Sequence, residues 1–137
     1  MTNIVAAIRA GAVYFAVVFV LGFILGTVRV VWVAPQLGEA TAVFLEAPII
    51  LAFSWAVSRW CVSYFQVQAN LAARLLMGLV AFVLLMSAEL GVSVTAFGRS
   101  VADHFAGYLS LPGSIGGSAQ LIFAFLPVIQ GWARGRH

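Results

Sequence analysis

The fold is decided by residues 22–59, which read GFILGTVRVVWVAPQLGEATAVFLEAPIILAFSWAVSR. This stretch contains two long apolar runs joined by a short polar turn, which is the pattern of a hairpin of two membrane-spanning helices. Arg29 and Glu46 lie inside the apolar runs, and Glu39 lies at the turn. Charged side chains at the centre of a span cost about 2.5–3.5 kcal/mol each on insertion scales, so they usually face other helices or water. We therefore expect the rest of the chain to pack around this hairpin and shield its charges.

The composition excludes a soluble protein. Of the 137 residues, 64% are hydrophobic and only 8% are charged, whereas about 25% of the residues in a typical soluble domain are charged. The whole chain, residues 1–137, is therefore predicted to form one all-α transmembrane domain in the lipid bilayer. All seven basic residues are arginines, and they are scattered along the chain. Because there is no basic run to follow a phosphate backbone, nucleic acid is not expected as a partner.

The apolar runs predict four transmembrane helices, at about residues 10–35, 39–58, 75–97 and either 115 or 119 to 132. Pro35 is expected to end the first helix, because proline has no amide hydrogen to donate. Pro48 lies inside the second helix and predicts a kink. The first run is too long for the apolar core of a secretory signal peptide, so an uncleaved helix is expected.

Two connections between the helices are long enough to hold structure of their own. Residues 59–74 contain no glycine or proline and are flanked by arginines, which predicts a helix at the membrane interface. Within residues 98–118, apolar side chains recur at helical spacing. This predicts a short amphipathic interfacial helix between the third and fourth spans, and Pro112 with the nearby glycines is expected to end it.

The placement of the arginines predicts the orientation of the chain. With both termini in the cytoplasm, two arginines, Arg29 and Arg99, lie on the outer side. The five on the cytoplasmic side are Arg9, Arg59, Arg74, Arg134 and Arg136. Because cytoplasmic ends carry an excess of basic residues, we expect a multi-pass protein of the bacterial inner (cytoplasmic) membrane, with the N-terminus and the C-terminus inside.

Three of the charged residues are expected to meet in the outer half of the membrane. At about 1.5 Å of rise per helical residue, Arg29, Glu46 and Glu89 lie at similar depths below the outer ends of three different helices. We predict that they form an intramembrane charge cluster. One arginine facing two glutamates leaves a carboxylate in excess, which can be protonated, bind a cation or contact water.

Near the outer surface, above this cluster, the sequence places Glu39, Asp103 and His104. Asp103 and His104 are adjacent in the chain, and we interpret them as a solvated surface pair rather than a metal or acid–base site. Two interpretations of the charge cluster below them remain open. It can be a polar cluster that fixes helix packing, or it can be a proton- or ion-handling site or a substrate pocket open to the outside.

Gly22 and Gly26 form the motif G-x-x-x-G in the first predicted span. Small residues four apart allow two helix backbones to approach closely. We expect these glycines to pack against another helix of the same chain, and a homodimer contact is the alternative.

The residues that common membrane chemistries require are missing from the sequence. Neither His104 nor His137 lies within a predicted span, so paired axial ligands for a haem are not expected. Cys61 is the only cysteine, so it has no partner for an internal disulfide or a cysteine metal cluster. No serine nucleophile elbow or phosphate-binding glycine loop is recognisable. The sequence therefore predicts no catalytic residue, no metal site and no cofactor.

The first hairpin, about residues 20–60, resembles a family of small uncharacterised four-span bacterial inner-membrane proteins. The residues that carry the resemblance are Gly26-Thr27, Arg29, Pro35, Gly38-Glu39, Glu46, Pro48, Ser54-Trp55 and Arg59. This resemblance implies no known activity.

Three classes of function follow from these observations. We expect a small membrane protein without catalytic machinery, acting as an accessory or structural subunit of a larger membrane complex. The alternative is a small homo-oligomeric transporter or channel that uses Glu46 and Glu89 with Arg29 as the counter-charge. A membrane enzyme that works at the outer face with Glu39, Asp103 and His104 is the third and least supported class.

Overall fold

Four long helices form the computed structural model, which describes residues 2–134. They are α1 (Thr2–Val28), α3 (Glu39–Phe65), α4 (Leu71–Thr95) and α6 (Leu111–Arg134). Each lies in a segment long and apolar enough to cross a membrane. These findings confirm the prediction of an all-helical chain with four such helices. Arg136, which the orientation argument placed on the cytoplasmic side, and His137 lie outside the described residues.

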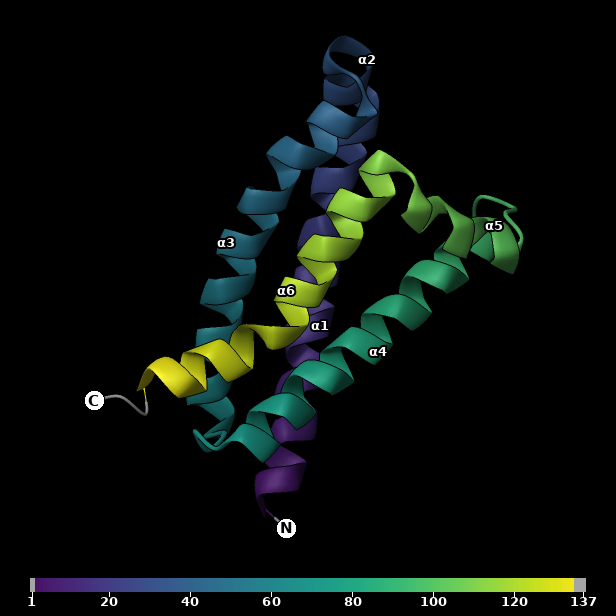
Figure 1. The fold of residues 1–137 in the computed structure, drawn as a ribbon. Coiled ribbons are helices and arrows are strands. Elements are labelled where there is room, and N and C mark those ends of the chain that lie inside the picture. The colour runs from purple at the N-terminus through teal and green to yellow at the C-terminus, as the bar shows by residue number, and fades with distance from the viewer. Residues whose placement is uncertain (1, 135–137) are drawn as a thin grey trace.

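The four long helices close a ring in the order α1, α4, α6 and α3, because each helix packs against the next. The start of α1, the α3–α4 connection and the end of α6 lie at one end of the bundle (Figure 1). We call this the terminal end. The opposite end carries two short helices, α2 (Ala34–Leu37) and α5 (Val101–Ala106), and we call it the hairpin end. Toward the hairpin end, α3 and α4 diverge (Figure 1).

At the hairpin end, the first long helix continues past the predicted stop. A π-helical turn, η1 (Arg29–Val33), follows α1 and leads directly into α2. Pro35 does not end the helix, because it directly follows the π-helical turn η1 and the helical conformation continues through α2 to Leu37. The chain turns instead at Gly38, whose φ of +86° suits glycine.

At the terminal end, the interfacial helix predicted over residues 59–74 does not form. Helix α3 runs on to Phe65, because Cys61 and Val62 of this stretch are buried in the core and hold it in the bundle. Gln66 then ends the helix in the left-handed conformation, with φ of 54°. Helix α4 begins at Leu71, earlier than the predicted residue 75, and the side chain of Asn70 caps it.

A short helix does lie between the third and fourth long helices. Ser100 caps α5 by accepting a hydrogen bond from the amide of Asp103, and the 3₁₀ turn η2 (Gly107–Leu109) follows. The expectation that Pro112 and the nearby glycines end this short helix is wrong. The helix and its 3₁₀ turn end by Leu109, and α6 already begins at Leu111 and includes these residues. Pro112 is tolerated there because it lies in the first helical turn.

The core of the bundle lies in the half near the terminal end. Tyr14, Cys61 and Met77 are fully buried there, and the ring of Tyr14 stacks on that of Phe123. The Tyr14 hydroxyl donates a 2.7 Å hydrogen bond to the carbonyl of Phe123. That carbonyl lacks its usual helical donor because Pro127, four residues later, has no amide hydrogen. The tyrosine hydroxyl thus supplies the hydrogen-bond donor that the proline removes from the α6 backbone.

Arg74 is part of this core, although its place at the end of a predicted loop suggested an interfacial position. Its side chain is only 2% exposed. Its Nη1 donates to the carbonyl of Pro127 at 3.0 Å, and its Nε and Nη2 donate to the carbonyls of Gln68 and Val67. The arginine therefore ties the α3–α4 connection to α6 and closes the bundle at the terminal end.

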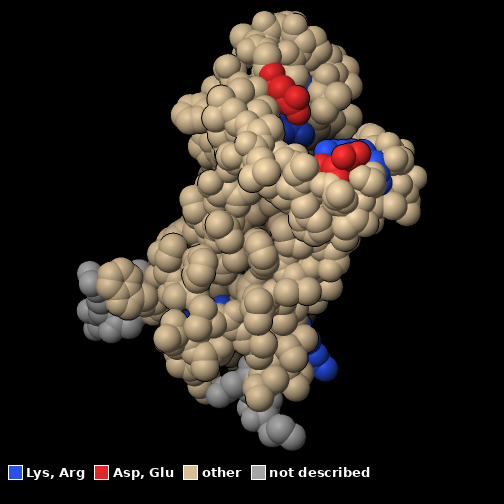
Figure 2. Space-filling model, turned by 45° about the vertical axis from the view of Figure 1, so that its right-hand side comes forward, with Lys and Arg blue, Asp and Glu red and all other residues tan. Residues whose placement is uncertain are grey.

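The charged side chains visible on one face of the molecule lie toward its two ends (Figure 2). Red and blue groups gather near the hairpin end, and blue alone appears near the terminal end. The broad surface between them is free of charge in this view. A band of this kind suits contact with lipid acyl chains.

Candidate functional site

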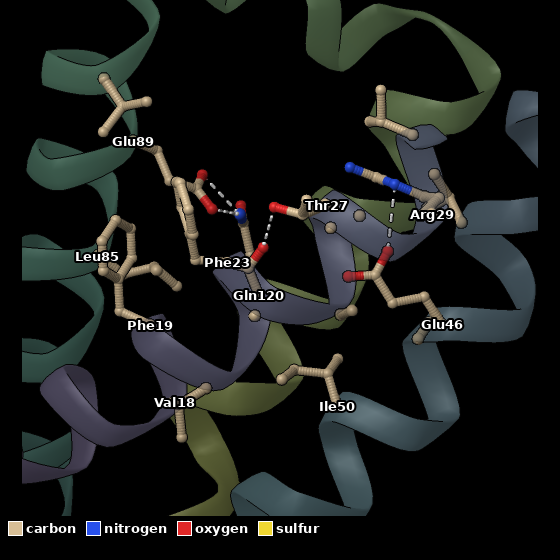
Figure 3. Close-up of a pocket in the computed structure, with 18 of the residues that line it drawn as sticks. Val18, Phe19, Phe23, Thr27, Arg29, Glu46, Ile50, Leu85, Glu89 and Gln120 are labelled. Atoms are coloured by element: carbon tan, nitrogen blue, oxygen red, sulfur yellow. Dashed lines mark hydrogen bonds and ion pairs between the residues drawn. The ribbon is translucent and has the colours of Figure 1, made fainter. Parts of the chain in front are cut away.

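The half of the bundle near the hairpin end encloses a pocket of about 820 Å³. All four long helices line it (Figure 3). Its deep part is apolar and includes Val18, Ile50, Leu85 and Phe123. The ionisable side chains in its lining are Arg29, Glu39, Glu46, Glu89, Arg99 and His104. Apolar walls with a few converging polar groups and a volume of this size are typical of small-molecule sites.

Arg29 and Glu46 face each other on one side of the pocket (Figure 3). The Nε atom of Arg29 lies 3.3 Å from the Oε2 atom of Glu46. The two side chains are 27% and 18% exposed, so the pair is neither fully buried nor free in solvent. Arg29 begins the π-helical turn, and turns of this rare kind occur often at functional sites. Two of the three predicted cluster residues are therefore an ion pair.

Glu89, the third predicted member, lies on the α4 wall and does not pair with Arg29 (Figure 3). The Nε2 atom of Gln120 is 2.6 Å from both of its carboxylate oxygens, and the hydroxyl of Tyr108 donates to its Oε2 at 3.3 Å. Both partners are neutral donors. The structure thus places the three charges in one pocket, with Glu89 hydrogen-bonded by an amide and a phenol.

Tyr108 links this carboxylate to the outer polar residues. Its hydroxyl also lies 3.5 Å from Nε2 of His104. Burial, the negative charge of Glu89 and the hydrogen bond to it together raise the pKa of Tyr108 to about 12. The phenol therefore stays protonated at physiological pH and remains a hydrogen-bond donor to Glu89.

The predicted outer-surface polar group is divided by the structure. Glu39 and His104 line the pocket. Asp103 does not, and its exposed side chain lies on α5. Its backbone carbonyl accepts a 2.7 Å hydrogen bond from Nη2 of Arg99, which does line the pocket. Asp103 therefore contributes a carbonyl to the rim and leaves its carboxylate outside.

Gly22 and Gly26 line the pocket, on the α1 wall. A Cβ atom at Gly22 would meet only Ile50 Cδ1 at 3.8 Å, and one at Gly26 would meet only Arg29 Nη2 at 3.6 Å. Both are ordinary contact distances. A Cβ atom at Gly11 would instead lie 2.6 Å from the carbonyl oxygen of Met77 on α4. The motif glycines leave room for the pocket, whereas Gly11, which sequence reasoning passed over, permits close helix packing.

Sequence reasoning missed three polar residues of the pocket region. Gln120 and Tyr108 hold Glu89, and Ser93 lines the wall. Ser93 is 6% exposed, and its Oγ atom has no hydrogen-bond partner among the described residues. The available signal for Gln120 was a polar amide inside the fourth apolar run, where such residues usually face the bundle interior.

Known proteins do not identify this site. What the site can bind is therefore inferred from its geometry. An apolar chamber carries an ion pair on one side and a separately held carboxylate on the α4 wall. No protein-family model matches the chain, and no curated protein or solved structure is significantly similar to it.

Proposed function

We propose that the chain is a multi-pass protein of the bacterial inner membrane, with both termini and the terminal end in the cytoplasm. The four long apolar helices and the uncharged band in Figure 2 support this assignment. The excess of arginines at the terminal end supports the orientation. In this arrangement the pocket lies in the outer half of the membrane, and α5 is the amphipathic helix at the outer surface, with Val101 and Phe105 exposed to lipid.

Cysteine labelling tests this orientation. Native Cys61 is buried, so it gives little background. Gln36 and Ala69 are exposed at opposite ends of the bundle. In intact spheroplasts, a membrane-impermeant maleimide is expected to label Gln36→Cys and to spare Ala69→Cys until the cells are lysed. Labelling of Ala69→Cys alone before lysis would reverse the proposed orientation.

We propose that this protein is non-catalytic and binds a small organic solute in the outer-half pocket. One observation carries the proposal: the bundle is hollow near the hairpin end and closed near the terminal end. The hollow part holds the pocket of about 820 Å³. The closed part is sealed by Tyr14, Met77 and Arg74, all with exposed fractions of 2% or less. A chamber closed at one end suits binding from the outer side better than continuous conduction.

A thermal-shift experiment tests solute binding. The purified chain in an uncharged detergent is melted with a panel of cationic, anionic, zwitterionic and neutral organic solutes. At least one charge class is expected to raise the melting temperature, because a ligand that binds only the folded state stabilises it. The matched control is Gly22→Trp, which fills the pocket from the α1 wall. If no class stabilises the wild type, or if Gly22→Trp is stabilised equally, the binding proposal fails.

We propose further that this protein acts as an accessory subunit of a larger membrane complex. All four long helices expose large apolar side chains outside the pocket, among them Ile24, Phe44, Leu79 and Phe125. Such surfaces suit contact with lipid or with other membrane subunits. Purification from native membranes in a mild detergent is expected to retain larger subunits, and a chain that always purifies alone would argue against this role.

Transport by a homo-oligomer is the second candidate. Pro48 in α3 and Pro127 in α6 each remove a helical hydrogen bond, and η1 interrupts the first long helix. These are points at which helices can bend, and bending near Pro127 would open the closed half. Uptake by proteoliposomes that is lost in folded Glu46→Gln and Glu89→Gln variants would favour transport over simple binding.

A further inference from the structure

We propose that the pocket binds an organic monocation with a bulky apolar body, whose charge lies against Glu89. This inference rests on the proposed binding function and names the class of ligand. Three observations carry it: the balance of charges around the pocket, the apolar character of its walls, and a buried hydroxyl on the same helix face as Glu89.

The charges that line the pocket leave two carboxylates without a basic partner among the described residues, the exposed Glu39 and the half-buried Glu89. Three glutamates and two arginines line it. Arg29 is paired with Glu46, and Arg99 donates to the backbone of Asp103. Among the described residues, Glu89 receives hydrogen bonds from Gln120 and Tyr108 only. These donors satisfy carboxylate lone pairs but carry no charge. Because Glu39 is exposed to solvent, the unpaired negative charge inside the pocket lies at Glu89.

The walls near Glu89 favour an apolar cation over a hydrated metal ion. Phe19, Phe23 and Leu85 lie close to the Glu89 side of the pocket (Figure 3), and Phe97 and Phe123 also line it. Aromatic faces attract organic cations, whereas hard metal ions require several oxygen ligands. The pocket volume of about 820 Å³ exceeds what a single ion needs and lies in the range of drug-sized ligands.

Ser93 supplies an additional polar contact. It lies on α4 four residues after Glu89, and side chains at this spacing share one helix face. Ser93 lines the pocket and is buried, with an exposed fraction of 6%. Even so, its Oγ atom has no hydrogen-bond partner among the described residues. Buried polar atoms normally form a hydrogen bond. A ligand held at Glu89 would also contact this hydroxyl, because both side chains lie on the same face of α4.

Equilibrium dialysis with two ions of equal shape and opposite charge tests the inference. The probes are tetraphenylphosphonium and tetraphenylborate, each measured with the full chain in an uncharged detergent and corrected for binding to protein-free micelles. We expect the wild type to bind the phosphonium at least tenfold more tightly than the borate. Glu89→Gln is expected to weaken phosphonium binding at least tenfold, and Glu89→Asp, which keeps the charge, is expected to retain the preference for the cation.

Asp103→Asn is the matched control, because the Asp103 side chain does not line the pocket. It should bind the phosphonium like the wild type, and all variants are checked for wild-type melting. Equal affinity for the two ions, preference for the borate, or unchanged binding by folded Glu89→Gln would each overturn the cation assignment. In these cases, binding that Gly22→Trp abolishes would still uphold the pocket. If neither ion binds, the cation assignment fails. The binding proposal fails with it only if the solute panel also yields no ligand.

Discussion

Replacing Arg74 with alanine is expected to lower the free energy of unfolding by about 3 kcal/mol, because buried polar groups left without a partner cost about 1–3 kcal/mol each. The guanidinium donates to the carbonyls of Pro127 and Val67 within the closed half of the bundle. Its removal takes the arginine donor from the carbonyls of Val67 and Gln68, breaks the tie to Pro127, and leaves a cavity beside Gly131, which packs against the arginine side chain. Denaturant unfolding in detergent measures the loss.

Two other substitutions separate burial from charge. Arg59→Ala removes an exposed arginine near the same end of the bundle and should leave stability unchanged. Arg74→Lys keeps the charge but offers a single ammonium group, which cannot reproduce the fork of guanidinium donors. It should therefore fall between the wild type and Arg74→Ala. An Arg74→Ala variant that unfolds like the wild type would show that the arginine does not hold the closed half together.

The contrast between Arg74 and Arg59 also explains what sequence reasoning could reach. By hydropathy, both residues are charges that flank a span. The hydropathy pattern predicts the four long helices correctly, but it does not indicate how deeply each arginine is buried. One of the acceptors that satisfy the buried Arg74 is the carbonyl of Pro127, which is 53 residues away. Contacts over such separations are set by how the helices pack, and the local pattern of one run does not contain them.

The predicted helix boundaries are wrong for a local reason. A proline was taken to end a helix at residues 35 and 112. Pro112 lies in the first turn of α6, where its missing hydrogen is harmless, and Pro35 follows a π-helical turn through which the helix continues to Leu37. Residues 59–65 looked interfacial by composition, but burial of Cys61 keeps them helical within the bundle. A proline or an arginine in the sequence therefore does not by itself locate the end of a helix.

For the candidate site, the sequence predicted the depth of the three charged residues in the bundle but not which residues pair with one another. Counting residues from the helix ends brings Arg29, Glu46 and Glu89 to one level, and all three line one pocket. Which of them pair depends on the rotation of each helix about its axis, and a depth estimate does not include rotation. The pairing of Glu89 with Gln120 follows from the contact of α4 with α6, which the sequence did not reveal.

Replacing Gly78 with alanine is expected to lower the free energy of unfolding by about 3 kcal/mol, at the upper end of the usual cost of overpacking a core. A Cβ atom at Gly78 would overlap the carbonyl oxygen of Ala124 on α6. A flexible side chain can rotate away from such an overlap, but a backbone carbonyl cannot. Helices α4 and α6 must therefore move apart, which also disturbs the nearby stacking of Tyr14 on Phe123.

Gly91→Ala on the same helix is the matched control and should have the opposite effect. A Cβ atom there meets nothing within 4 Å, and alanine is favoured over glycine in a helix interior by about 1 kcal/mol. Thermal and denaturant unfolding of the two variants in the same detergent compare one chemical change at two positions. If both alanines changed stability by the same amount, α4 and α6 would not cross at Gly78. If only Gly78→Ala is destabilised, helix propensity cannot be the cause, and the close α4–α6 contact is what holds the closed half beneath the pocket.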